Sequence, residues 1–233
     1  MAAASGEEED RGVAPVGSSP DPYRLPHKAL RLVLGSLLAR AGRTDFGDVG
    51  SIAQFRPELD AAVALLADHA RFEVRHLDPL LGGHDPESAA NVQHQHMDLE
   101  RELHRAASGL HEVEAILGDD GDGDPDEARE RGHAFYLSLT RFVASYLVHV
   151  ADEEEVTLPA LRRFVTDDAL REALARARHD VPSDRASYGA SLILRAASPF
   201  ERVALVRAAP ELRTIARVVL SELEWRALED ALG

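Results

Sequence analysis

The sequence contains no cysteine among its 233 residues. This absence excludes disulfide bonds, a thiolate nucleophile and any metal held by sulfur. A metal site in this chain would have to use imidazole and carboxylate ligands, which suit iron, manganese or zinc. The positions of the 11 histidines therefore matter more than their number.

Positive charge is also scarce, because 26 basic residues face 41 acidic ones and leave a formal net charge of −15. Such a balance argues against nucleic acid or an anionic membrane as a partner. The first 22 residues contain no apolar segment of the kind that a secretory signal needs, and no uncharged apolar run of about 18 residues follows. We therefore expect a cytoplasmic protein with neither nucleic acid nor membrane as a partner.

Patterns typical of strands are absent, and the chain divides into three parts. Residues 1–21, rich in Gly, Ser, Pro and acids, are expected to form a disordered acidic tail. Residues 22–165 carry long helical patterns, and residues 166–233 carry shorter ones. We expect an all-α fold, in which an up-down four-helix bundle is followed by a C-terminal appendage of roughly four to five short helices.

Glycines and prolines mark the expected ends of the helices. The acidic stretch 118–126 invites comparison with a calcium loop, but Pro125 stands where that loop needs glycine and Arg131 where it needs glutamate, so we interpret it as a solvated linker. In the last part, Ser198 and Ser221 each precede a glutamate by three residues, which is the pattern of a capping box. The four long helices are predicted at residues 22 or 26 to 41, 51 or 56 to 81, 86 to 117, and 126 to 164, the last kinked near Pro159.

One sequence motif, H-x3-E-x5-P-x-L, occurs twice. The first copy contains His69 and Glu73, and the second contains His149 and Glu153. Residues i and i+4 share one face of a helix, so each copy can present an imidazole and a carboxylate to one point. Two such helices facing each other look like half of a dinuclear metal site.

Each predicted long helix carries a histidine where its apolar stripe calls for leucine. Counted from the connecting loops of an up-down bundle, all four fall at one level near one end; His96 and His149 differ by only about 3 Å at ~1.5 Å per residue. A single histidine on an apolar face is usually a hydrogen-bonded core residue. Two buried carboxylates are harder to explain in that way, because an unpaired buried charge costs several kcal/mol, and a divalent metal pair removes this cost. The four histidines are His27, His69, His96 and His149.

This spaced set resembles the hemerythrin-like, or HHE cation-binding, family over residues 22–165, and the prolines after both H-x3-E units fit as well. The resemblance implies two non-haem iron ions joined by an oxo or hydroxo bridge, with zinc or manganese as alternatives. It implies that Glu73 and Glu153 bridge the two irons. It also implies that each iron binds two histidines: His27 with His69, and His96 with His149.

Two positions depart from that family pattern. Hemerythrin carries a second histidine at i+4 on its third helix, where this chain has Glu100, and it spaces its last carboxylate at i+5, which here is Glu154. The apolar stripe favours Glu153 over Glu154, which is turned about 100° away. An oxygen ligand at Glu100 would make the site harder and favour the ferric state. We therefore include Glu100 among the predicted metal ligands, and expect oxidant reactivity or sensing rather than reversible oxygen carriage.

Three nearby residues leave alternatives open. His76 lies on the stripe nearer the end of the bundle and is interpreted as lining the entrance, with ligation as the alternative. His94, two residues off the stripe, is the alternative to His96. Tyr146 is interpreted as a core residue, or as a hydrogen-bond donor to a bound oxygen species.

The expected function is binding of, or reaction with, O2, peroxide or a similar small diatomic ligand at a di-iron site. Turnover would take the form of peroxide decomposition or an oxidase-type reaction. One alternative is an iron- or oxygen-responsive regulatory module without turnover, which acts on a protein partner through the C-terminal helices. Another is a structural bundle that binds zinc.

Overall fold

The structure is a computed structural model that describes residues 19–118 and 121–233. Over these two ranges the protein is all-helical and contains no strand, so the predicted all-α class is confirmed. The predicted tail at residues 1–21 falls almost entirely outside the described residues.

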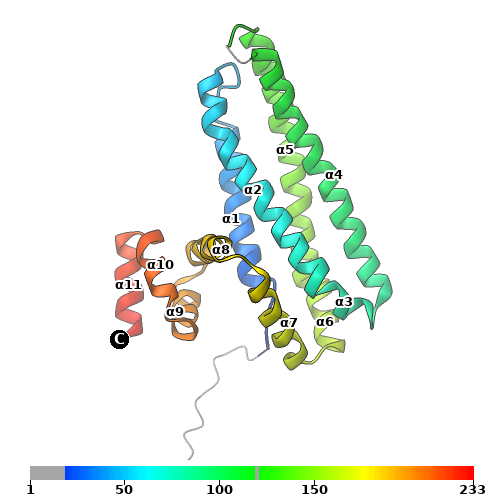
Figure 1. Ribbon diagram of the computed structural model, residues 1–233, viewed down its shortest axis with the longest axis vertical. Helices are drawn as coiled ribbons and strands as arrows, with labels where there is room; N and C mark the ends of the chain where they lie inside the picture. The colour runs from blue at the N-terminus through cyan, green and yellow to red at the C-terminus, as the bar shows by residue number, and fades with distance from the viewer. Residues whose placement is uncertain (1–18, 119–120) are drawn as a thin grey trace, which may run out of the picture.

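Four long helices run side by side along the long axis of the molecule (Figure 1). Their apolar stripes meet in one core, to which Leu34, Phe55, Leu110 and Leu139 each contribute a fully buried side chain from a different helix. Burial of these stripes, rather than intrinsic helix propensity, stabilises helices of this kind. The four are α1 (Arg24–Ala41), α2 (Val49–His76), α4 (Pro86–Leu117) and α5 (Pro125–Asp152).

Aspartates begin three of the long helices. The carboxylates of Asp48, Asp85 and Asp124 accept hydrogen bonds from backbone N–H groups in the first turns of α2, α4 and α5. Because Asp48 provides this cap, α2 begins before the predicted start at residue 51 or 56. Pro57 consequently lies inside the helix rather than near its beginning.

The second predicted helix does not continue unbroken to residue 81. α2 ends at His76, and a separate short helix, α3 (Asp78–Gly82), follows it. Pro79 has no N–H with which to continue the helical ladder of α2, whereas proline is well tolerated in the first turn of a new helix. The break therefore falls directly after the His69–Glu73 unit.

The kink predicted near Pro159 takes the form of a wide π turn. This turn covers Glu153–Thr157 and separates α5 from α6 (Leu158–Phe164), and the N–H of Leu158 donates to the carbonyl of Glu153, five residues back. Since Pro159 cannot donate a backbone hydrogen bond, the wide turn absorbs the interruption. Glu153, the predicted bridging carboxylate, is its first residue.

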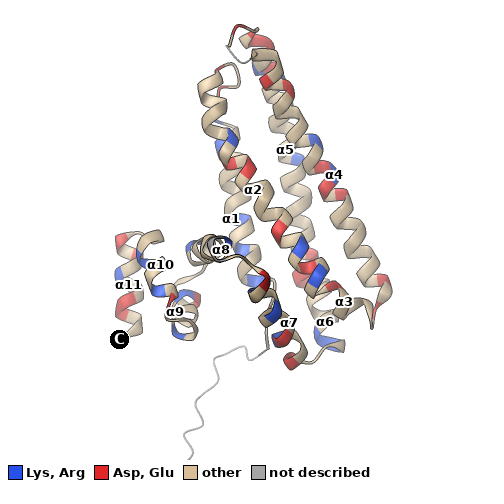
Figure 2. Ribbon diagram, in the orientation of Figure 1, with Lys and Arg blue, Asp and Glu red and all other residues tan. Residues whose placement is uncertain are grey.

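Shorter helices follow from residue 167, in agreement with the predicted number, and lie beside the lower half of the long helices (Figure 1). The capping boxes predicted at Ser198 and Ser221 are both present. Basic and acidic residues both occur on α7, α9 and α11 (Figure 2). The segment consists of α7 (Asp167–Asp180), α8 (Ser183–Ala196), α9 (Pro199–Ala208), α10 (Leu212–Val219) and α11 (Glu222–Leu232).

The helical run Pro125–Phe164 is long and apolar enough to cross a membrane by length and composition alone, with a mean hydropathy of 1.2 over its most apolar stretch. This is weak evidence, because a helix in the core of a globular protein passes the same test. The run also carries buried polar residues, His149 and Glu153. The absence of a membrane partner stays a prediction.

Candidate metal centre

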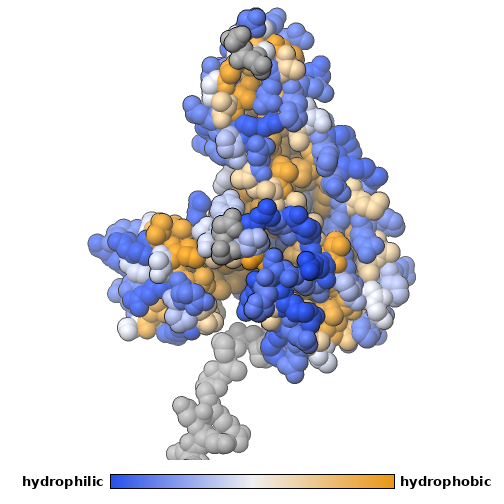
Figure 3. Space-filling view, in the orientation of Figure 1, coloured by the Kyte–Doolittle hydropathy of each residue, from blue (hydrophilic) through white to orange (hydrophobic). Residues whose placement is uncertain are grey.

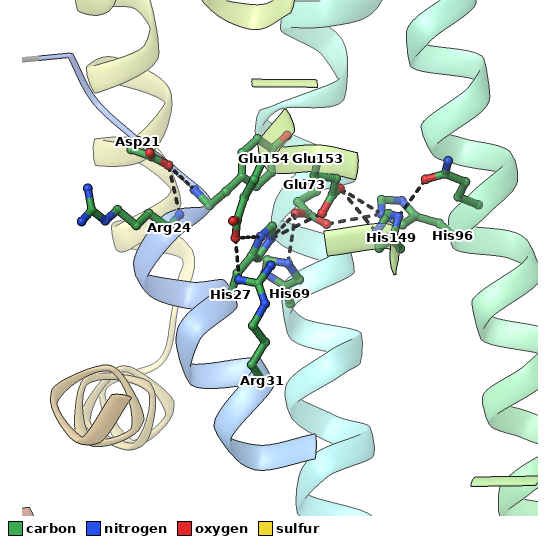
Figure 4. A network of polar contacts seen from close by, with 12 residues as sticks. Asp21, Arg24, His27, Arg31, His69, Glu73, His96, His149, Glu153 and Glu154 are labelled. Atoms are coloured by element: carbon green, nitrogen blue, oxygen red, sulfur yellow. Dashed lines mark hydrogen bonds and ion pairs between the residues drawn. The ribbon is translucent and has the colours of Figure 1, made fainter. Parts of the chain in front are cut away.

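Six of the seven predicted ligands come together near the end of the long helices where α3 and α6 lie (Figures 1 and 4). Their side chains point toward one another from separate elements, and the two carboxylates are each only 1% exposed. The six residues are His27 on α1, His69 and Glu73 on α2, His96 on α4, His149 on α5, and Glu153 at the start of the π turn.

Each of the two carboxylates directs one oxygen to each pair of histidines. Oε1 of Glu73 lies 3.0 Å from Nε2 of His69, whereas its Oε2 lies 3.3 Å from Nε2 of His96. Oε2 of Glu153 lies 3.4 Å from Nε2 of His27, whereas its Oε1 lies 3.4 Å from Nε2 of His149. The six side chains thus form two groups that share both glutamates, and within each group the ligand atoms lie within 4.8 Å of one another.

Most of these converging atoms have no hydrogen-bond partner among the described residues. The unpartnered atoms include Nε2 of His27, His69 and His96, together with both carboxylate oxygens of Glu73 and of Glu153. Leaving a buried polar atom unpaired costs about 1–3 kcal/mol. Histidine nitrogens and carboxylate oxygens are suitable ligands for iron, manganese and zinc. The cluster can therefore hold a metal ion, which would give these atoms their missing partners.

The other ring nitrogens of two histidines are held from outside the cluster. Nδ1 of His27 donates to Oε1 of Glu154 over 2.9 Å, and Arg31 donates to the same oxygen over 2.7 Å. Nδ1 of His149 donates to Oε1 of Gln95 over 2.9 Å. A proton on Nδ1 leaves the lone pair on Nε2, which is the nitrogen that faces the cluster.

Burial and the charges of neighbouring residues shift the pKa values of the cluster side chains in different directions. Burial and the charge of His96 lower the pKa of His149 to about 3. Burial acts to lower the pKa of His96 as well, but Glu153 and Glu73 outweigh it and raise that pKa to about 10. Burial acts to raise the pKa of Glu73, yet its histidine neighbours hold it well below its usual value. His149 is thus neutral at pH 7, whereas a metal would have to displace a proton from His96.

The prediction that Glu100 is a metal ligand is wrong, because its side chain does not point toward the cluster. The Glu100 side chain is 74% exposed and lies 3.9 Å from the exposed His104 rather than in the cluster. Glu100 is four residues from His96, but a helix turns about 40° beyond one full circle over that interval. On α4 this rotation carries the residue past the edge of the apolar stripe into solvent. Glu100 therefore provides no oxygen ligand that would favour the ferric state.

Three further residues, for which the sequence leaves two interpretations open, lie outside the cluster: His76, His94 and Tyr146. His76 contacts Asp180 of α7 over 3.1 Å, and His94 is exposed, so neither joins the metal-binding groups. Tyr146 is 6% exposed, with its ring centroid 5.8 Å from that of His149. Burial raises its pKa well above the usual value, so its phenol stays protonated and can donate.

Sequence reasoning missed residues that surround the cluster. The apolar stripe predicts that Glu154 faces away from the cluster, yet Glu154 accepts a hydrogen bond from His27; no sequence pattern indicates Gln95, which accepts one from His149. Asp78 is 8% exposed and its Oδ2 has no hydrogen-bond partner in the described chain. Burial raises the pKa of Asp78, and its carboxyl is electrostatically coupled to His96 and Glu73. Its position directly before Pro79, where α2 breaks, is the one available sequence signal.

Comparisons with models of known families, with curated proteins and with solved structures found no significant match to this chain.

Proposed function

We propose that this chain is a hemerythrin-like four-helix bundle that holds two iron ions in the cluster and binds, or reacts with, O2 or peroxide. The observation that carries the proposal is the orientation of Glu73 and Glu153. Each buried carboxylate offers one oxygen to the His27–His69 pair and the other to the His96–His149 pair. That arrangement suits a pair of metal ions bridged by two carboxylates.

The number of available protein ligands supports reaction with a small oxidant. Each of the two groups would offer a metal ion two histidines and one oxygen from each shared glutamate, which would leave room for a further small ligand. Because the Glu100 side chain is exposed, it would not occupy that place. A redox-active iron pair would supply the electrons for reaction with an oxidant, and zinc would not.

The protein itself would orient the ligands and exclude water. Arg31 and Glu154 fix the ring of His27, and Gln95 fixes that of His149. Buried apolar side chains cover the end of the cluster that faces α3 and α6, and Tyr146 offers a protonated phenol near His149. The apolar residues at this end are Tyr23, Leu77, Leu81, Leu158 and Leu161.

The test is peroxide decomposition by protein grown with iron. We expect the parent protein to show oxo-to-iron charge-transfer bands and to convert two H2O2 into O2 and two H2O faster than the same amount of free iron. His69→Ala should lose both properties while its helical circular dichroism is retained. His104→Ala, which alters an exposed histidine on α4, is the matched control. A colourless, zinc-containing protein without turnover would instead support the structural alternative.

One contact favours the regulatory alternative as a second candidate. Arg24 and Lys28, which flank His27 on α1, both pair with Glu201 of α9, over 2.9 Å and 2.7 Å. A shift of α1 on metal binding would therefore reach the C-terminal helices. Apolar side chains gather on the surface of this part of the molecule (Figure 3), and a groove of about 440 Å³ lies between α9 and α11, with Phe200 and Leu223 at its edge.

This second candidate makes a separate prediction. Iron should change the rate of proteolysis after residue 165 in a protein that does not turn over peroxide. Turnover without any change in proteolysis would favour the first candidate.

A further inference from the structure

The two halves of the cluster differ in the partners that hold their histidines. On one side, His27 donates to Glu154, a carboxylate that Arg31 also contacts. On the other side, His149 donates to Gln95, a neutral amide. The bridging glutamates are common to both halves, so they cannot distinguish the two positions.

An anionic acceptor and a neutral acceptor have different effects on a metal-ligating histidine. A carboxylate that accepts the Nδ1 proton pulls electron density toward Nε2, so the imidazole becomes a stronger donor to the metal. It also places a negative charge near the cation. A neutral amide fixes the orientation of the ring but contributes neither effect to the same degree.

The histidines of the two halves also differ in burial, and those of the His27–His69 half are the more buried. The side chains of His27 and His69 are 0% and 7% exposed, whereas those of His149 and His96 are 4% and 13% exposed. The guanidinium of Arg31 donates to the same oxygen of Glu154 that accepts from His27. The carboxylate that supports His27 is therefore paired with a cation and fixed in place.

We infer that the two metal positions are unequal: the His27–His69 position binds first and more tightly, and Glu154 is the positioning residue that makes it so. The inference rests on the proposed dinuclear site but not on iron or on any reaction. It assigns a role to Glu154, the carboxylate at i+5 from His149, while the i+4 carboxylate, Glu153, faces the two groups of histidines.

The experiment titrates metal-free protein with Co²⁺ and follows its ligand-field bands, with calorimetry as a second readout. The parent should bind in two steps of different affinity. Glu154→Gln keeps the shape of the side chain and removes its charge, and should weaken the tighter step about 10- to 100-fold. Glu155→Gln is the matched control, because it makes the same charge change at the exposed neighbouring residue.

Single-position variants identify which step has changed. With His149→Ala the remaining tight position is that of His27 and His69, and adding Glu154→Gln should weaken it. With His69→Ala the remaining position is that of His96 and His149, and adding Glu154→Gln should leave it nearly unchanged. The reciprocal variant Gln95→Glu should strengthen the weaker step and bring the two affinities closer together.

The outcomes separate failure of the inference from failure of the proposed function. If the parent binds two Co²⁺ ions with equal affinity, or if Glu154→Gln behaves like Glu155→Gln, the inference is wrong and the dinuclear site stands. If Glu154→Gln weakens both positions equally and lowers the thermal stability of the metal-free protein, its role is structural and the inference is again wrong. If the parent binds no Co²⁺, Zn²⁺ or Fe²⁺ at these residues, the proposed function fails and the inference fails with it.

Discussion

The same apolar stripes run along the whole core of the long helices, but the two ends of the core differ in composition. One end is filled by aromatic rings and the other by buried polar side chains. At the end away from the cluster, the rings of Phe46, Phe55 and Phe135 pack edge to face, with centroids 5.4–6.2 Å apart. At the other end, the stripe positions hold His27, His69 and their partners, most of whose ligand atoms lack a hydrogen-bond partner in the described chain.

The difference separates the end of the core that stabilises the fold from the end that could hold a metal ion. The aromatic end gains free energy from burial and from ring contacts. The cluster end loses free energy in the metal-free protein, because polar atoms are buried without partners. A fold of this kind needs the first end in order to tolerate the second.

Truncation at the aromatic end should have the largest effect. Phe135 is 1% exposed and contacts both other rings, so Phe135→Ala should lower the free energy of unfolding by about 3–5 kcal/mol. Denaturant unfolding followed by circular dichroism measures the change. Phe200→Ala, which alters an exposed ring, should change it by less than about 0.5 kcal/mol. Equal losses in the two variants would overturn the assignment of stability to this end.

Removal of metal should act on the cluster end alone. At a free metal concentration 1,000 times the dissociation constant, bound metal stabilises a protein by about 4 kcal/mol, and chelation should remove that amount. Phe135 and His149 are 14 residues apart on α5, or ~21 Å at ~1.5 Å per residue. The same loss should therefore appear in the Phe135→Ala background, as expected for independent sites. A chelation effect that disappears in that background would show that the two ends are coupled.

The contact between the cluster end and the C-terminal helices should depend on acid. Burial acts to raise the pKa of Glu201, but Lys28 and Ser198 outweigh it and lower that pKa from 4.5 to about 2. Because the folded-state pKa is depressed, the stabilisation is fully present above pH 4.5 and is lost as the pH falls towards 2. Glu201→Gln, which preserves the capping box, should lower the free energy of unfolding by about 2 kcal/mol at pH 7 and flatten this dependence.

Glu172→Gln provides the control for that measurement, because Glu172 forms an exposed ion pair within α7. Its effect should stay within about 0.5 kcal/mol. If the two variants show the same pH profile, Glu201 does not anchor α9 to α1.

The smallest effect is expected at Glu100. Since its side chain lies in solvent, Glu100→Gln should leave metal content, visible spectrum and stability unchanged, the last within about 0.5 kcal/mol. Loss of metal in this variant would mean that α4 rotates when the site is loaded, and would restore Glu100 to the ligand set.

The ligands that could be predicted from the sequence are those that occupy the apolar stripe. His69, His149 and their i+4 glutamates lie where helical periodicity places them, and counting residues from the loops brings His27 and His96 to the same level. Periodicity does not predict whether a residue at the edge of the stripe is buried, because that depends on the exact rotation of the helix about its axis. Glu100 lies outside that edge on α4 for this reason.

The surrounding residues could not be predicted because they depend on neighbouring helices. Glu154 lies off the core stripe of its own helical run, but it contacts the buried His27 on the neighbouring helix α1. Asp78 becomes buried because α2 ends at His76 and α3 begins in a new direction. The prolines of the repeated H-x3-E-x5-P-x-L motif indicate such breaks but do not determine the direction of the next helix.

The central claim is that the unpartnered buried atoms of the histidines and glutamates are metal ligands. Its most direct test is the metal content of protein grown with iron, compared between the parent and a double variant, Glu73→Gln with Glu153→Gln. The account predicts about two irons per chain in the parent, one for each group of ligands, and none in the double variant. Absence of stoichiometric metal from the parent, or the same content in both proteins, would contradict it.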